Sequence, residues 1–231
     1  MALIYDISRL AKSGLVAQQS AQRDWSPFLV HFTSYSEMKP VRKLLRKISP
    51  HSAKQFSEEL TKADEASFKV VQQILNCDNP LLRKTSPNAK EELPECVCLT
   101  ECTFPGLFGH SERFGRFGFV FGKCEIFNLG GRPMAYVDSD TYGSLDTQHN
   151  ENELVNRIWR FANVYRPIGC GQVQDFTVER EWRIFTDLPL QDNLRAVLAP
   201  DSFVSRFHEL LRENKIDVPV LPIDMLYNWG V

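Results

Sequence analysis

The pattern of apolar and polar residues divides the chain into a helical first part and a second part that is richer in strands. Apolar side chains recur at helical spacing across 52–75, which predicts one long amphipathic helix or two shorter ones. A compact apolar run at 28–32, earlier in the chain than this helix, predicts a strand. Further helices are predicted at 4–11 and 36–48, and the polar, proline-bearing stretch 76–94 is predicted to be a loop.

From residue 95 onward, short apolar runs predict strands with helices between them. The predicted strands are 95–101, 115–121, 133–137, 176–185, 193–198 and 218–221, and the predicted helices are 106–112, 123–129, 151–162 and 202–213. Helices lead and a mixed, mainly antiparallel sheet follows, which indicates an α+β class rather than a doubly wound parallel sheet. We interpret 1–231 as a single α+β domain, with a helix-rich part at 1–94 and a β-rich part at 95–231.

Composition and charge narrow the class of protein. The chain has 231 residues, of which 43% are hydrophobic and 24% charged, so it can form a sizeable core without disulfide bonds. No stretch approaches the roughly 18 apolar residues of a membrane span, and no signal-peptide pattern begins the chain. We therefore expect a cytoplasmic protein with no membrane association. The formal net charge of −2 argues against nucleic acid as a bulk partner. The basic run 42–47 fits a solvated helix face or a small basic patch.

The cysteines are expected to be reduced thiols, because disulfides are rare in cytosolic proteins. Cys96, Cys98, Cys102 and His110 form the combination that most resembles a zinc site. A C-x-C pair points both sulfurs to one face of a strand, however, and a second pair of ligands is missing. We therefore expect no bound metal. The six cysteines are Cys77, Cys96, Cys98, Cys102, Cys124 and Cys170.

The best candidate for a functional centre is the acidic strand at 179–183. Its alternation puts Glu179, Glu181 and Arg183 on one face and Trp182 on the other. Two carboxylates on one face repel each other. Such a pair is therefore typical of a site that binds a cation or a sugar hydroxyl, or that catalyses a reaction. One carboxylate can stabilise positive charge while the other orients or deprotonates a nucleophile. Pairing of glutamate with arginine across strands is the alternative, and it needs no function.

Three further candidates lie at predicted strand ends. His31 sits in an apolar strand, where it either donates a hydrogen bond to a ribose hydroxyl or phosphate, or is a satisfied core residue. Thr100 and Glu101 close the strand 95–101 and place a hydroxyl and a carboxylate at the same sheet edge, where we expect both to bind the nucleotide. We expect Thr100, Glu179 and Glu181 to line one cleft with His31.

The turn before the strand 115–121 offers groups that suit a nucleotide. Arg113 or Arg116 could grip a pyrophosphate with two hydrogen bonds, and Phe117 could stack on a flat ring. Gly115 and Gly118 are too few for a phosphate-binding loop, and neither G-x-G-x-x-G nor a P-loop occurs. The G-x-S-x-G pattern of many serine hydrolases is also missing.

Four segments occur in an order that resembles a known family. They are Pro94–Glu101, Phe114–Lys123, Arg132–Val137 and Glu179–Arg183. The chain is similar, from about 28 to 188, to the AbiGi family of abortive-phage-resistance proteins and to related families of phage-defence and toxin–antitoxin neighbourhoods. The resemblance implies a role in phage defence. Because the AbiGi member is regarded as an antitoxin, it also implies a toxin or other defence-system protein as a possible partner.

The order of the His31 strand, the Thr100 turn and the acidic strand also resembles ADP-ribosyltransferases. This resemblance implies that fold and NAD as substrate. His31 would then contact the adenosine ribose, Thr100 the nicotinamide side, Glu181 would be the catalytic carboxylate, and Glu179 would orient the acceptor. The chain departs from the pattern at Phe117, where one branch has tyrosine, and in having no Ser-Thr-Ser motif.

Two functions therefore lead. The first is an NAD-dependent ADP-ribosyltransferase or NAD glycohydrolase in phage defence, in which Glu181→Gln is expected to keep the fold and abolish activity. The second is a non-catalytic antitoxin or sensor that binds a toxin. A nucleic-acid-processing protein is a third interpretation, which the mild acidity disfavours.

Overall fold

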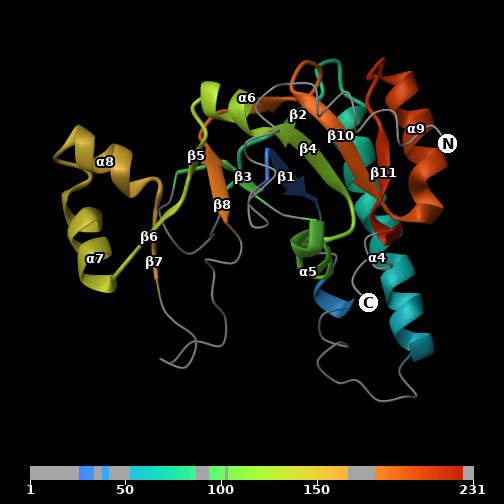
Figure 1. Ribbon diagram of the computed structural model, residues 1–231, viewed down its shortest axis with the longest axis horizontal. Coiled ribbons are helices and arrows are strands. Elements are labelled where there is room, and N and C mark those ends of the chain that lie inside the picture. The colour runs from blue at the N-terminus through green and yellow to red at the C-terminus, as the bar shows by residue number, and fades with distance from the viewer. Residues whose placement is uncertain are drawn as a thin grey trace.

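A computed structural model describes residues 26–33, 38–41, 53–86, 94–101, 104–165 and 180–225. These residues form a mixed α+β fold around a seven-stranded sheet (Figure 1). The strands, in sheet order, are β11 (Val220–Pro222), β10 (Leu194–Ala199), β4 (Gly118–Gly122), β1 (Phe28–Phe32), β3 (Val97–Thr100), β8 (Glu181–Ile184) and β5 (Arg132–Pro133). Neighbouring strands are antiparallel except for the parallel pair β10 and β11.

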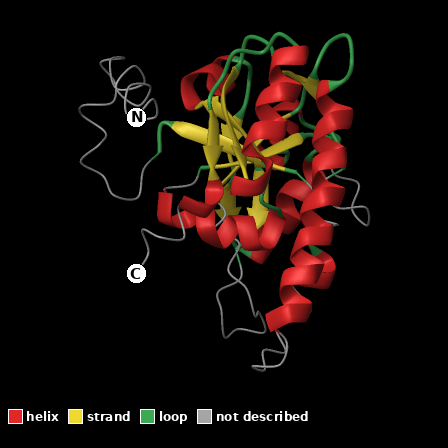
Figure 2. Cartoon of the chain, turned by 90° about the vertical axis from the view of Figure 1, so that its right-hand side faces the viewer, coloured by secondary structure: helices red, strands yellow, loops and turns green. Residues whose placement is uncertain are grey.

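Two long helices cover one face of this sheet. They are α4 (Ala53–Leu75) and α9 (Val204–Glu213), which Figure 2 shows beside the strands. Their apolar side chains join those of the strands in one large core, because both helices carry an apolar stripe at helical spacing. This core includes Phe68, Val71, Phe207, Leu211, Leu29, Leu99, Phe119, Trp182 and Ile184.

The opposite face of the sheet has a smaller apolar cluster. Val30 and Val120 of the sheet pack there with Leu107 of helix α5 (Phe104–Phe114). Gly118 lies in this layer, and a Cβ at that position would come within 2.9 Å of a Val30 methyl group. Glycine is therefore needed for the close approach of β4 and β1. Towards β3 and β8 the same face becomes polar.

A lobe at residues 135–164 extends from the sheet (Figure 1, left). It contains the parallel strands β6 (Ala135–Val137) and β7 (Ala162–Val164) and the helices α7 (Ser139–Gln148) and α8 (Glu153–Trp159). Asp138 and Asn152 cap the two helices, because each side chain accepts two backbone N–H groups of the first turn. The Trp159 ring stacks on His149 with 3.9 Å between ring centroids and donates to Asp146.

Most predicted elements are confirmed within the described residues. The apolar run 28–32 is β1, and the periodic stretch 52–75 is the single helix α4. Helix α6 (Lys123–Asn128) follows β4, as predicted. The predicted helix 4–11 and most of 36–48 lie outside the described residues. The helix-rich first part also supplies β1, which lies in the middle of the sheet.

One prediction about local structure was wrong, and one helix was not predicted. The stretch 76–94, predicted to be a loop, contains strand β2 (Leu81–Leu82), which pairs with β9 (Leu188–Pro189). Helix α7 was not predicted, because none of its residues is buried and it therefore lacks an apolar stripe. Among the described helices, none has the length and apolar content that spanning a membrane requires.

Candidate functional site

The polar end of the sheet brings together two of the predicted site residues. Thr100 of β3 stands directly opposite Glu181 of β8, and Cys98 stands opposite Arg183. Opposite residues of an antiparallel pair project to the same face. Thr100 is 8% exposed and Arg183 is 5% exposed, so this polar group lies largely within the protein. We call Thr100, Glu181 and Arg183 the strand-end cluster.

Within the strand-end cluster, Arg183 holds the Glu181 carboxylate with two hydrogen bonds. Its Nε donates to Oε1 over 2.8 Å and its Nη2 donates to Oε2 over 3.3 Å. Burial lowers the pKa of Arg183, but the Glu181 charge and hydrogen bond raise it more, so the net direction is upward. The prediction that Glu181 and Arg183 share a face is confirmed, although glutamate and arginine pair along one strand rather than across two. Glu179 lies outside the described residues.

The backbone just before Glu181 is unusual. Arg180 has a left-handed φ of 44°, a conformation that residues other than glycine seldom adopt. Its carbonyl accepts the backbone N–H of Glu101 over 3.1 Å, which ties it to the end of β3. Regular strand alternation therefore starts at Glu181. Backbone strain of this kind often occurs next to functional residues.

Glu101 lies in a separate buried ion cluster. Its carboxylate is 2.8 Å from the Lys123 ammonium and 3.2 Å from the Arg180 guanidinium, and it accepts the indole N–H of Trp182 over 3.2 Å. The Glu101 side chain is 7% exposed. Two cations and an indole thus already satisfy the carboxylate that was predicted to bind a nucleotide, so these contacts give Glu101 a structural role.

His31 belongs to the other face of the sheet. It stands opposite Phe119 of β4, whereas its neighbour Val30 stands opposite Thr100. Because strand side chains alternate, the register directs His31 and Thr100 to opposite sides. The His31 Nδ1 lies 2.8 Å from the Cys98 carbonyl, which can only accept, so Nδ1 carries the proton and donates. Burial lowers the pKa of His31, which favours the neutral ring. The register thus does not bring His31 into the expected shared cleft.

Of Arg113, Arg116 and Phe117, which were also proposed for nucleotide binding, two are used inside the protein. The Arg116 guanidinium binds both oxygens of Asp224, at 2.6 and 2.8 Å, and lies 3.4 Å from Asp64 of α4. Phe117 is 0% exposed and packs in the core against aromatic rings of α4 and α9. Arg113 lies over the ring of Phe114, 4.8 Å from its centroid.

The structure adds two thiols to this part of the sheet. Cys96 and Cys98 are free, and their sulfur atoms are 3.7 Å apart. The C-x-C spacing on a strand was the signal that could have placed them beside Thr100. His110, which was considered as a zinc ligand together with these cysteines, stacks between Phe32 and Phe114. Cys102, the fourth residue of that combination, lies outside the described residues. No group of three or more possible metal ligands occurs among the residues that the structure describes.

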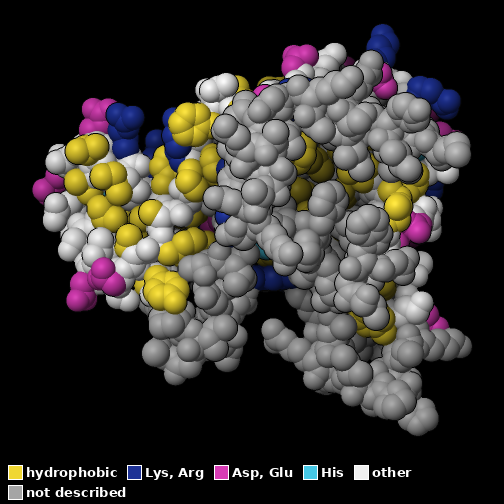
Figure 3. Space-filling view, in the orientation of Figure 1, with side chains coloured by type: hydrophobic (Ala, Val, Ile, Leu, Met, Phe, Trp, Pro, Cys, Tyr) yellow, Lys and Arg dark blue, Asp and Glu magenta, His cyan; other side chains and the backbone are white. Residues whose placement is uncertain are grey.

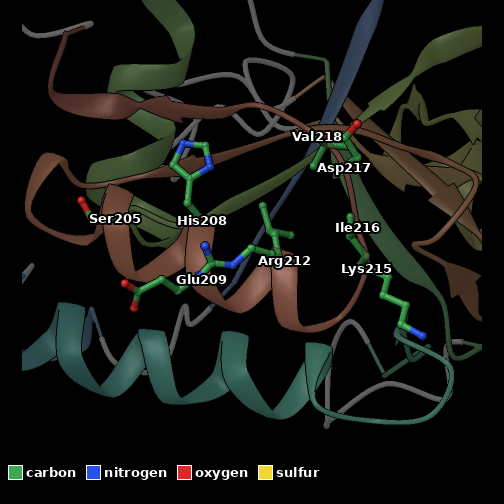
Figure 4. Close-up of a pocket in the computed structure, with 9 residues that line it drawn as sticks. Ser205, His208, Glu209, Arg212, Lys215, Ile216, Asp217 and Val218 are labelled. Atoms are coloured by element: carbon green, nitrogen blue, oxygen red, sulfur yellow. The ribbon is translucent and has the colours of Figure 1, made fainter.

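A surface hollow lies elsewhere, between helix α9 and the segment that leads to β11 (Figure 4). Its volume is about 680 Å³, and its lining includes His208, Glu209, Arg212, Lys215 and Asp217. These side chains mix both charges, and none of the predicted site residues belongs to the lining. The hollow therefore does not coincide with the strand-end cluster.

Comparison of the chain with models of known families, with curated proteins and with solved structures gives no match in any of the three.

Proposed function

We propose that this chain acts in phage defence and that Glu181 is the catalytic carboxylate of an NAD-consuming site, as an ADP-ribosyltransferase or an NAD glycohydrolase. The observation that carries the proposal is the pairing of Thr100 with Glu181 on adjacent strands, where Arg183 fixes the carboxylate in one orientation. The sequence resemblance supplies the substrate and the role in defence. The left-handed backbone at Arg180, directly before Glu181, also supports a functional position.

The proposed reaction needs a fixed negative charge. When nicotinamide leaves NAD, it takes the electrons of the glycosidic bond, and positive charge develops on the ribose. A carboxylate that is already oriented stabilises this charge without reorganising, and removing one such stabilising group costs about a hundredfold to a thousandfold in rate. Attack by water completes hydrolysis, and attack by an acceptor completes transfer. In this proposal Thr100 supports the nicotinamide side, and Glu179 orients the nucleophile.

A second candidate is a non-catalytic antitoxin or sensor that binds a toxin or another defence-system protein. Two observations favour it. First, Arg183 already balances the charge of Glu181, and His31 projects to the other face of the sheet. Second, five of the six large apolar side chains that are exposed among the described residues fall between 127 and 165, and hydrophobic side chains gather on the lobe in Figure 3. The five are Phe127, Leu129, Leu154, Ile158 and Tyr165.

The structure changes which substitution tests the enzyme. Glu181→Gln removes the counter-charge of Arg183, which is 5% exposed, so it should destabilise the fold. Sequence reasoning alone expected that variant to fold normally. Glu181→Asp keeps the charge and the partner but withdraws the carboxylate by one methylene, and small displacements of a catalytic group reduce rates strongly. Glu65→Asp makes the same change at a glutamate on α4 that pairs with Arg206, and is the matched control.

The test is nicotinamide release from NAD by the purified chain, measured together with thermal stability. The enzyme proposal expects release by the wild type and by Glu65→Asp, and strongly reduced release by Glu181→Asp at unchanged stability. If the wild type releases no nicotinamide but protects cells from the product of a neighbouring gene, the second candidate holds. Leu154→Ser and Ile158→Ser should then weaken that protection.

A further inference from the structure

Two thiols lie side by side at the start of β3, Cys96 directly before the strand and Cys98 on the face that also carries Thr100. Cys96 and Cys98 are two residues apart, so strand alternation directs both to the same side. Their sulfur atoms are 3.7 Å apart, and both are free. Cys96 is 1% exposed, whereas Cys98 is partly exposed. The two residues therefore form a dithiol in which Cys98 is the more exposed residue.

Cys98 links this dithiol to His31 and to the strand-end cluster. Its carbonyl accepts the hydrogen bond from His31, and its strand partner is Arg183, which holds Glu181. The hydrogen bond between the two thiols lowers the pKa of Cys96 against the opposing effect of burial, and the Arg183 charge acts in the same downward direction. The same hydrogen bond, followed by burial, raises the pKa of Cys98. The environment thus favours thiolate on Cys96 over thiolate on Cys98.

We propose that Cys96 and Cys98 are a redox-active dithiol that a low-molecular-weight disulfide converts into an intrastrand disulfide. In the first step Cys98, the more exposed residue, loses its proton, and its sulfur attacks one sulfur of the small disulfide, so that one small thiolate leaves. The easier ionisation of Cys96 serves the second step. In the second step the Cys96 thiolate attacks the Cys98 sulfur of this mixed disulfide, and the other small thiolate leaves. The two cysteines are oxidised, the small disulfide is reduced to two thiols, and the two cysteine protons end on those thiols.

Closing the disulfide requires β3 to contract. The sulfur atoms must approach from 3.7 Å to about 2 Å. In an extended strand, Cα atoms two residues apart are separated by roughly 6.6 Å, near the upper limit of about 6.8 Å for a disulfide. Contraction at Cys98 would displace the carbonyl that His31 binds and would disturb the pairing of Thr100 with Glu181. Oxidation should therefore loosen the contact between β3 and β8.

The chemistry of the dithiol does not depend on the proposed function, so its test uses no NAD. The full chain is equilibrated with graded ratios of oxidised and reduced glutathione, the remaining thiols are alkylated, and the chain is digested with trypsin. The fragment 91–113 contains Cys96, Cys98 and Cys102. Formation of the disulfide lowers its mass by the two hydrogens lost, about 2 Da, and leaves two sulfurs unalkylated. Fragmentation of this peptide from the wild type then locates the linked pair without any substitution.

The expected result is a link between Cys96 and Cys98 that survives in Cys102→Ser and disappears in Cys98→Ser. Cys124→Ser removes an exposed thiol elsewhere and should change nothing, which makes it the matched control. Three results would overturn the proposal. They are a fragment that stays reduced in fully oxidised glutathione, a link that requires Cys102, and a stable glutathione adduct on Cys98 that never resolves.

Discussion

The carboxylate of Asp64 competes with Asp224 for one guanidinium, and this predicts an unusual dependence of stability on pH. Arg116 binds both oxygens of Asp224, whereas Asp64 lies 3.4 Å from Arg116 and is 5% exposed. Within the described residues, Oδ1 of Asp64 has no hydrogen-bond partner. Burial raises the pKa of Asp64 to about 6, the Arg116 charge opposes this rise, and the Asp224 charge adds to it.

The magnitude follows from that pKa. The ordinary pKa is 3.8 and the value in the folded chain is about 6. One pKa unit corresponds to about 1.4 kcal/mol, so the folded chain disfavours ionised Asp64 by about 3 kcal/mol. Because the folded pKa lies above the unfolded one, the folded state binds the proton more tightly. The penalty is fully present above about pH 7, falls between about pH 6 and pH 4, and is gone below the unfolded pKa.

Asp64→Asn should therefore stabilise the protein at neutral pH. We expect its free energy of unfolding to exceed that of the wild type by up to about 3 kcal/mol at pH 7.5 and to match it near pH 4. Urea unfolding at a series of pH values measures this difference. Glu65→Gln removes a charge from the next position of α4, where Glu65 forms an exposed pair with Arg206, and should change stability by less than about 1 kcal/mol at every pH. If Asp64→Asn were less stable than the wild type at pH 7.5 and matched it near pH 4, the ion pair with Arg116 would outweigh the cost of burying the charge, and the reasoning would be refuted.

Four other substitutions test contacts elsewhere in the described fold. Glu101→Gln should lower the free energy of unfolding, measured with urea, by about 3 kcal/mol or more, because it leaves the Lys123 charge without its buried partner. A loss below about 1 kcal/mol would contradict the importance of this ion pair. Phe117→Ala should cost about 3–5 kcal/mol, since its ring is 0% exposed, and an unchanged melting temperature would show that the ring does not belong to the core. Gly131→Ala should lower the melting temperature, because the new Cβ would lie 2.9 Å from the Ile126 carbonyl oxygen. Gly143→Ala on helix α7 should raise the melting temperature, because its Cβ meets no atom within 4 Å and alanine favours the helix. Equal effects of the two substitutions would contradict the geometry.

Local patterns explain which parts of the fold could be predicted from the sequence. The helix α4 and the strand β1 were predictable because each presents a long or compact apolar pattern to the core. The two-residue strands β2 and β5 have no period to detect, and their existence depends on partners far along the chain. Helix α7 has no buried residue and begins at the capping side chain of Asp138.

The same distinction applies to the candidate site. The shared face of Glu181 and Arg183 was predictable, because alternation along one strand is a local property. The partners of Arg116 and Glu101 were not, because they come from distant elements or depend on tertiary packing. Asp224, for example, lies 108 positions from Arg116. Placing His31 relative to Glu181 required the register of several strands, which the sequence pattern does not specify.

The most direct test of the proposed NAD-consuming site is the rate of nicotinamide release by Glu181→Asp relative to the wild type, with Glu65→Asp measured alongside. The proposal predicts a measurable rate for the wild type, the same rate for Glu65→Asp, and a decrease of about a hundredfold or more for Glu181→Asp, with equal melting temperatures for all three proteins. Nicotinamide release by Glu181→Asp at the wild-type rate would contradict the role of Glu181, and no release by any of the three would contradict the enzyme itself.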